Sequence, residues 1–147
     1  MPRVSFYLCG GTDERQRLKI ACRMAEQAYL AGQRVLVSLQ DPAQLQLFDD
    51  LLWTFADRSF VPHEAYLNDA QWQDAPILLG CGAQPQQPFD LLINLAESVP
   101  PAAALASQVT EIIDADEPRK RAGRDRFRYY RDQGMAPETH NIQAQQA

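Results

Sequence analysis

The sequence predicts an α/β fold: an open, mostly parallel sheet in three layers, with helices on both faces. Short apolar runs alternate along the chain with stretches whose apolar residues recur at helical spacing. Two of these runs, residues 35–39 (VLVSL) and 91–95 (LLINL), are almost continuously apolar, which is typical of strands covered on both faces. The length of 147 residues suits one domain with a single core.

The first strand and helix come from the N-terminal segment. Residues 4–8 (VSFYL) predict a short buried strand that ends at Gly10 and Gly11. Either Thr12 or Asp13 can cap the helix that follows, and Gly32 ends it. Its apolar positions recur at helical spacing: Leu18, Cys22, Ala25 and Tyr29.

A second strand and helix follow at once. After the strand at residues 35–39, Asp41 supplies a cap and Pro42 occupies the first helical position, where proline is favoured. The apolar stripe of this helix comprises Leu45, Phe48, Leu51 and Leu52. We therefore expect two strand–helix units before residue 53.

The second half of the chain predicts three more strands and one helix. We expect strands at residues 77–80, 91–95 and 110–116, an exposed loop at 82–88, and a short helix or turn at 99–108. The last helix begins at Glu117 and Pro118 and ends at Gly134. Residues 1–135 then form one domain, and residues 136–147 form a polar, flexible tail.

The charge of the chain is distributed unevenly. The whole chain carries a net charge of -5, yet residues 117–131 hold seven basic and two acidic residues, which leaves seven basic and seventeen acidic residues elsewhere. A protein that coats DNA depends on neutralising phosphates and is usually basic overall. The sequence therefore argues against a DNA-coating protein and draws attention to one basic segment.

Composition and targeting signals indicate a cytoplasmic protein. The chain has no apolar run near the roughly 20 residues that span a bilayer, and its N-terminus lacks a signal-peptide core. Its three cysteines fit neither a zinc site nor a redox pair, and His63 and His140 are its only histidines. We expect reduced structural thiols and no metal.

No catalytic constellation is visible in the sequence. The turn after the first strand, LCGGTDER, lacks the spacing of a dinucleotide-binding or P-loop motif. Asp49 and Asp50 are helix neighbours that do not face one another. Asp114 and Asp116 could share one face and hold a metal, but capping and turn roles are commoner for such residues. We expect a protein without catalytic residues or cofactor.

The basic segment, RAGRDRFRYYR, can form a binding surface. On a helix, Arg124, Arg128 and Arg131 line one stripe, and Phe127 and Tyr130 lie about 60–100° around the axis. Arginines beside an aromatic ring can receive an acidic peptide with an apolar end and a terminal carboxylate. The same pairing can stack nucleic-acid bases. The spacing is equally compatible with a helix that has no binding role, in which Phe127 and Tyr130 pack in the core and the arginines are exposed to solvent.

A second candidate surface lies in LLWTFADRSFVPH. This connection holds more large apolar side chains than a short loop needs, namely Trp53, Phe55, Phe60 and Val61. Tryptophan is enriched at protein interfaces, although core packing is the commoner fate of such residues.

The same segments resemble a known family. FYL in the first strand, LLW followed by SFVPH, then LLINL, EIID and the closing RDRFRYYRDQG are similar, in order and spacing, to the chi subunit of bacterial DNA polymerase III holoenzyme. The resemblance covers residues 3 to 135. It implies a noncatalytic, Rossmann-like α/β protein in the clamp-loader complex, active in DNA replication. Two positions depart from the usual pattern: Phe127 stands where the family often has tyrosine, and Arg128 where it can have lysine.

The resemblance also implies two protein partners. Chi subunits pair with the psi subunit, which tethers them to the clamp loader, and they bind the acidic C-terminal tail of single-stranded-DNA-binding protein (SSB). Carried onto this sequence, the psi-binding surface comprises Trp53, Phe60, Val61 and Pro62. The tail-binding surface comprises Arg124, Phe127, Arg128, Tyr130 and Arg131. DNA would then be met only indirectly. The alternative is direct binding of single-stranded nucleic acid by the basic helix.

Overall fold

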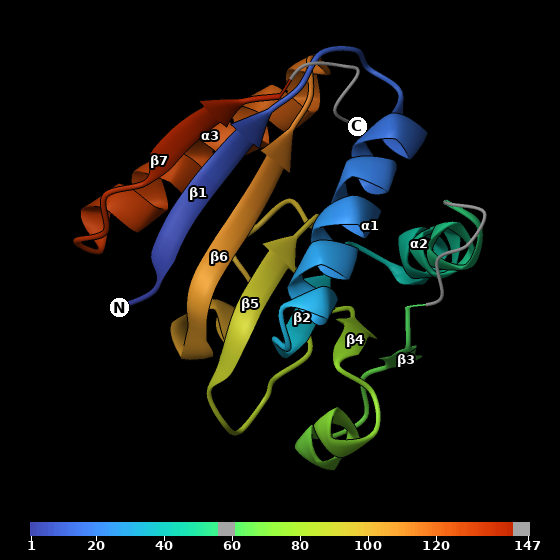
Figure 1. The fold of residues 1–147 in the computed structure, drawn as a ribbon. Helices are drawn as coiled ribbons and strands as arrows, with labels where there is room; N and C mark the ends of the chain where they lie inside the picture. Colours follow the sequence, from blue (N-terminus) through green and yellow to red (C-terminus); the bar gives the residue numbers. More distant parts are fainter. Residues whose placement is uncertain (56–60, 143–147) are drawn as a thin grey trace.

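The computed structural model describes residues 1–55 and 61–142. Within them, one sheet of seven strands runs in the order β3-β4-β2-β5-β6-β1-β7, and every neighbouring pair is parallel (Figure 1). The strands are β1 Arg3–Leu8, β2 Val35–Ser38, β3 His63–Ala65, β4 Ile77–Gly80, β5 Phe89–Asn94, β6 Ala106–Ile113 and β7 Glu138–Asn141. The predicted open parallel sheet is confirmed.

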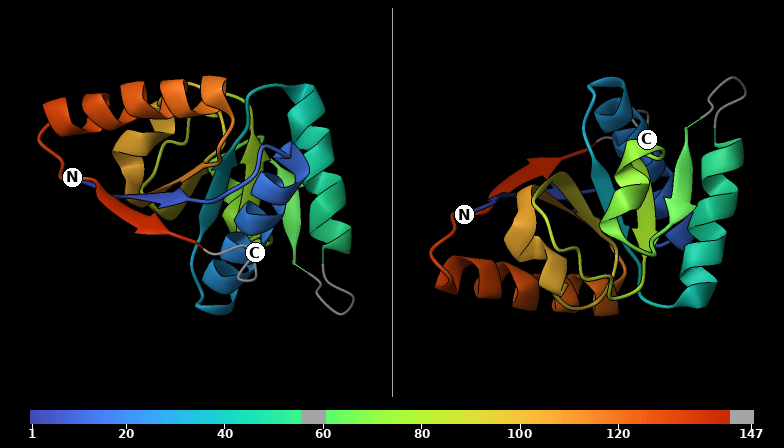
Figure 2. Two further views of the ribbon diagram at one scale, coloured as in Figure 1. Left: turned by 90° about the horizontal axis from the view of Figure 1, so that it is seen from above. Right: turned by 90° about the horizontal axis from the view of Figure 1, so that it is seen from below.

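Three α-helices and two short 3₁₀ helices connect the strands within the described residues. They are α1 Glu14–Leu30, α2 Pro42–Thr54, α3 Glu117–Asp132, η1 Asp69–Gln73 and η2 Pro101–Leu105. Helices α1 and α2 lie on one face of the sheet and α3 lies on the other, which makes three layers (Figure 2). None of the helices in residues 1–55 and 61–142 combines the length and apolar character that a membrane span requires.

Alternation along the strands produces two cores. In β2, Val35 and Val37 pack in the core under α1 and α2, whereas Leu36 packs in the core under α3. This explains why the central strands are apolar without a break: both of their faces are buried beneath helices. The continuous apolar runs of the sequence therefore follow from the three-layer arrangement.

Aspartates start all three α-helices. Asp13 accepts a hydrogen bond from the Arg15 backbone N–H at 3.0 Å, and Asp41 accepts one from Gln44 N–H at 2.8 Å. Asp116 accepts one from Arg119 N–H at 3.1 Å. Each cap satisfies a backbone donor that the helix itself leaves free. Because all strands are parallel and each capped helix follows a strand, the three capped ends gather at the carboxyl edge of the sheet.

Two strands were not predicted from the sequence. The three-residue strand β3 pairs with β4, and β7 pairs with β1 between Ser5↔Glu138 and Leu8↔Asn141. The sheet therefore continues beyond residue 135 into the segment expected to be a polar tail. All four residues of β7 are exposed, so this edge strand is held by its backbone ladder and has no apolar alternation to reveal it.

Strand β6 also differs from its predicted bounds. It begins at Ala106, inside the segment expected to be a helix or turn, and ends at Ile113. Asp114 and Asp116 therefore follow the strand instead of alternating along it, and β6 is followed by β7 as the last strand in the chain.

Candidate protein-binding groove

The carboxyl edge of the sheet is the place where α/β folds usually bind ligands. A crevice of about 370 Å³ lies at this edge and is lined by residues of α1, α2 and α3 and by the segment after β5. Its described lining contains no serine, cysteine or histidine. The crevice therefore offers no nucleophile paired with a base among the described residues.

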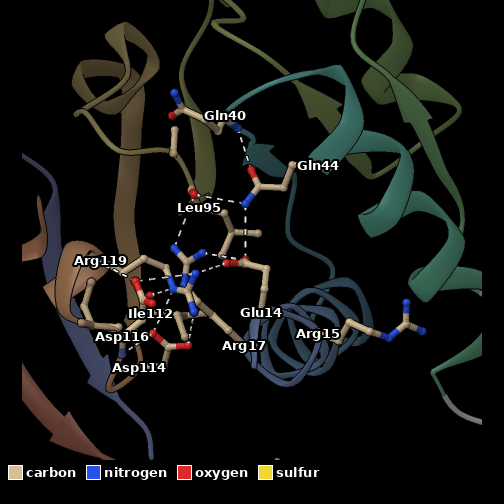
Figure 3. A network of polar contacts seen from close by, with 12 residues as sticks. Glu14, Arg15, Arg17, Gln40, Gln44, Leu95, Ile112, Asp114, Asp116 and Arg119 are labelled. Atoms are coloured by element: carbon tan, nitrogen blue, oxygen red, sulfur yellow. Dashed lines mark hydrogen bonds and ion pairs between the residues drawn. The ribbon is translucent and has the colours of Figure 1, made fainter. Parts of the chain in front are cut away.

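A network of arginines and carboxylates fills this edge (Figure 3). The Glu14 carboxylate lies 2.9 Å from Arg17 Nη1 and 2.8 Å from Arg119 Nη1. Gln44 Nε2 donates to the same carboxylate at 3.4 Å, so residues of all three helices meet at Glu14. Arg17 is buried and also donates from Nε to the Ile112 carbonyl at 2.8 Å. The two arginines at this edge are thus paired with a carboxylate of the protein itself.

Asp114 belongs to the same network and does not form a metal site with Asp116. Arg119 donates to Asp114 from Nε at 2.9 Å and from Nη2 at 2.7 Å. Partial burial raises the pKa of Asp114, but the hydrogen bonds from Arg119 and from the backbone N–H of Asp116 outweigh it and hold the pKa below its usual value. Residues 1–55 and 61–142 contain no group of three histidine, cysteine, aspartate or glutamate side chains that could hold a metal ion.

A second depression lies on the opposite side of the basic helix and has a different character. This groove, of about 260 Å³, runs between α3 and strands β1 and β7. Its lining residues are Phe6, Leu8, Ile113, Lys120, Gly123, Arg124, Phe127 and Thr139. Most of these side chains are apolar, and two are cationic. We call this depression the α3 groove.

The floor of the α3 groove depends on a close approach of helix and sheet. A Cβ atom at Gly123 would lie 2.7 Å from Ile113 Cδ1, a distance that real contacts do not reach. The ring of Phe127 packs against Phe6 with centroids 5.2 Å apart. Glycine at position 123 therefore lets α3 pack close to Ile113 of β6. Phe6 and Phe127 form an aromatic wall of the groove.

The rim of the groove is cationic. Arg124 is exposed and makes no ion pair with any residue that the structure describes. Lys120 is paired with Glu117 at 3.2 Å, and Arg128 is paired with Asp125, one turn apart on the exposed surface. Exposed pairs of this kind contribute roughly 0–1 kcal/mol and open readily. Arg124 is thus the guanidinium best placed to meet an anion.

The sequence-predicted tail-binding residues divide into two groups. Arg124 and Phe127 line the groove, and Arg128 and Arg131 are exposed on α3 outside its lining. Tyr130 is different, because its side chain is buried at 1 % exposure and its hydroxyl donates to Glu111 Oε2 at 2.8 Å. The expectation that Tyr130 contributes to the binding surface is corrected: it packs on the inner face of α3.

The predicted psi-binding residues are also divided. Trp53 is 49 % exposed at the end of α2, and its ring lies 4.7 Å from that of His63. Pro62 is half-buried, whereas Val61 is buried in the core under α1 and α2, so its side chain is not on the surface. Phe60 lies outside the described residues.

Sequence reasoning missed several residues of the α3 groove. Lys120 stands four residues before Arg124 and seven before Phe127, a helical spacing that would have placed it on the same face. Leu8, Ile113 and Thr139 carried no such signal, because a groove between a helix and two strands exists only once the chain has folded. Arg126 had no assigned role in the sequence analysis, and it is buried.

The chain is similar in sequence to proteins of one known family. A family model described as "DNA polymerase III chi subunit, HolC" matches residues 1–138. The DNA polymerase III subunit chi of Pseudomonas aeruginosa is 38 % identical over 142 residues, covering 97 % of this chain and 98 % of the relative. The subunit chi of Haemophilus influenzae is 30 % identical, covering 84 % and 86 %, and that of Escherichia coli is 28 % identical, covering 92 % and 95 %.

A solved structure shares the fold alone. The crystal structure of T4 UvsW matches with a TM-score of 0.68 and 9 % sequence identity. The match covers 97 % of this chain and 42 % of that chain.

Proposed function

This chain belongs to the DNA polymerase III chi subunit family, and we propose that it acts there as a noncatalytic adaptor. In this proposal the α3 groove holds the acidic C-terminal tail of SSB. The surface around Trp53 at the end of α2 binds the psi subunit of the clamp loader. The observation that carries the proposal is the α3 groove itself, an apolar slot whose rim holds Arg124, an arginine without an ion-pair partner among the described residues.

The chemistry of the groove suits the end of an acidic peptide. Its volume of about 260 Å³ is smaller than a typical cofactor site and can take one large apolar side chain. The Arg124 guanidinium can then donate a bidentate hydrogen bond to the terminal carboxylate of the peptide. Lys120 and Arg128 can leave their partners Glu117 and Asp125 and pair with acidic side chains of the peptide instead. The apolar contact supplies most of the affinity, and the cations supply orientation.

The charge of the remaining surface supports a peptide ligand over bare nucleic acid. Residues outside 117–131 carry seven basic and seventeen acidic side chains, which repel a long polyanion. A short tail meets only the cationic rim and escapes most of that repulsion. A micromolar site, about -8 kcal/mol, is enough, since several tails on one SSB assembly raise the effective concentration.

Two variants of one helix test this proposal. Arg124→Ala removes the guanidinium at the rim of the groove, and Arg121→Ala removes an exposed guanidinium of the same helix that does not line it. In fluorescence anisotropy with the labelled SSB tail peptide, we expect Arg124→Ala to bind about tenfold more weakly and Arg121→Ala to bind like wild type. Equal affinity for all three proteins would refute the groove assignment.

Bare single-stranded oligonucleotide serves as the competing ligand. Micromolar binding of the oligonucleotide at physiological salt, with no affinity for the peptide, would favour the nucleic-acid-binding alternative.

The psi surface rests on Trp53. A half-exposed tryptophan at a helix end is the type of residue that dominates protein interfaces. We expect Trp53→Ala to reduce co-purification of psi severely while the free energy of unfolding falls by less than about 1 kcal/mol. A loss of about 3–5 kcal/mol would instead identify Trp53 as a core residue.

The noncatalytic assignment rests on the carboxyl edge. Glu14 is held there between two arginines, in the place where nucleotide-binding relatives of this fold would keep room for phosphate. We expect no thermal stabilisation by nucleotides in the millimolar range. A nucleotide-dependent rise in melting temperature would contradict this part of the proposal.

A further inference from the structure

Helix α3 buries two of its polar side chains against the sheet. Arg126 is 4 % exposed, although it stands between Arg124 and Arg128, which are both exposed. Tyr130 follows Arg126 by one helical turn and is buried on the same face. Burying a guanidinium is costly unless it is fully paired, so its partners indicate what the arrangement achieves.

Both side chains converge on a single carboxylate of the sheet. Glu111 of β6 is fully buried, with Arg126 Nε at 2.9 Å from Oε1 and the Tyr130 hydroxyl at 2.8 Å from Oε2. Asn94 of β5 donates its Nδ2 to Oε2 at 2.9 Å. A further bond, from Arg126 Nη1 to the Glu97 carbonyl at 2.7 Å, reaches the segment after β5.

Two directional attachments one turn apart restrict a helix in a way that apolar packing does not. Apolar contact is non-directional and tolerates rotation or sliding of a helix, whereas hydrogen bonds weaken steeply when they are misaligned. Arg126 and Tyr130 together define both the rotation of α3 about its axis and its position along β6. Ion pairs in protein interiors add little net stability, and their best-attested use is to specify one packing register.

The groove depends on that register. Phe127 follows Arg126 directly and meets Phe6, and Phe6 lies 6.0 Å from the ring of Tyr130. Arg124 precedes Arg126 by two residues and stands at the groove. A rotation of α3 by a few tens of degrees would turn Arg124 and Phe127 away from β1 and β7.

We infer that Arg126 and Tyr130, acting through Glu111, are positioning residues that hold α3 in the rotation in which Arg124 and Phe127 form the peptide groove. This inference rests on the proposed function for its ligand and concerns residues that do not touch that ligand. In this inference the buried Arg126 orients α3, whereas exposed arginines of the same helix, such as Arg124, contact the partner.

The test uses Tyr130→Phe, which keeps the ring against Phe6 and removes one directional bond. We expect the full chain with this change to bind the labelled SSB tail peptide about fivefold more weakly at a temperature where it is fully folded. Val37→Ala, in the core on the opposite face, is the control for lost stability, and it should leave the affinity unchanged. An equal loss of peptide affinity in both variants would show that Arg126, Tyr130 and Glu111 only stabilise the fold.

Two further readouts separate this inference from the proposed function. In a double-mutant cycle, Tyr130→Phe should cost little extra affinity once Arg124 is alanine, and full additivity would overturn the inference. Without ligand, the nuclear Overhauser contact between the Phe6 and Phe127 rings should weaken in Tyr130→Phe and persist in Val37→Ala. If wild type does not bind the peptide, the proposed function fails, and this ring contact alone decides the inference; an unchanged contact would refute it.

Discussion

The two faces of α3 carry the same residue type in opposite environments. On the inner face, Arg126 is buried and shares the Glu111 carboxylate with Tyr130. On the outer face, Arg124 is exposed beside an apolar groove and has no ion-pair partner in the described chain. A basic helix is therefore not one cationic surface, because tertiary contacts decide which arginines are part of the fold and which remain available to a partner.

The buried cluster is also chemically unlike the network at the carboxyl edge. Burial raises the pKa of Glu111, although Arg126, Asn94 and Tyr130 all act to lower it, and burial together with the Glu111 charge raises the pKa of Tyr130. Asp114, at the more open edge, has a lowered pKa because its hydrogen bonds outweigh its desolvation. Depth in the protein thus decides whether a carboxylate with donors is easier or harder to ionise.

The largest expected effect comes from breaking the inner-face pair. Arg126→Met leaves Glu111 buried without a cation, and we expect the free energy of unfolding to fall by about 3–5 kcal/mol. Urea denaturation measures this change. The matched control is Arg121→Met, an exposed position of the same helix, where a change within about 0.5 kcal/mol is expected. Similar values for both variants would show that the two faces do not differ.

A larger residue in the floor of the α3 groove, at position 123, should have the next largest effect, on peptide affinity. In Gly123→Ala the new methyl group would meet Ile113 Cδ1, and both residues line the α3 groove, so relief of this contact must change the shape of the groove. The helix propensity of alanine, about 1 kcal/mol better than glycine, offsets much of the overpacking. We therefore expect unfolding free energy within about 1 kcal/mol of wild type and about tenfold weaker binding of the SSB tail peptide. Unchanged affinity would show that the peptide does not enter the groove.

Salt should affect the outer and inner faces of α3 differently. Raising the ionic strength from 0.1 M to 1 M shortens the screening length from about 10 Å to about 3 Å, which weakens contacts between exposed charges. We expect the peptide affinity of wild type to fall several-fold across this range. The coupling between Arg126 and Tyr130 in stability, measured by a double-mutant cycle in urea, should stay nearly constant because both partners are buried. A salt-sensitive coupling would contradict the buried geometry.

Acid should have the smallest effect among these changes. Because the pKa of Asp114 is lowered on folding, its contribution to stability is complete above its unfolded pKa of about 3.9 and is lost as the pH falls below that value through the folded pKa. Urea midpoints measured between pH 5 and pH 2 should decline more steeply for wild type than for Asp114→Asn. Parallel curves would show that Arg119 does not stabilise the ionised form.

Much of the fold could be predicted because it depends on local patterns. The apolar runs at residues 35–39 and 91–95 indicated strands covered on both faces, and Asp41 with Pro42 marked the start of α2. Strand β7 could not be predicted, since its four exposed residues carry no alternation and its ladder with β1 joins segments more than 130 residues apart. A backbone that pairs at a sheet edge leaves little trace in side-chain patterns.

The class of fold, the starts of the helices and the uneven charge of residues 117–131 could all be read from the amino-acid sequence. Helical spacing also placed Arg124 near Phe127. Folding was needed to turn Arg126 and Tyr130 inward to Glu111 and to bury Val61. It also brought Phe6, Ile113 and Thr139 together to complete the α3 groove. The physical reason is that propensity and periodicity act over one or two turns, whereas the desolvation and pairing of a charged side chain depend on residues that folding brings together from distant parts of the chain.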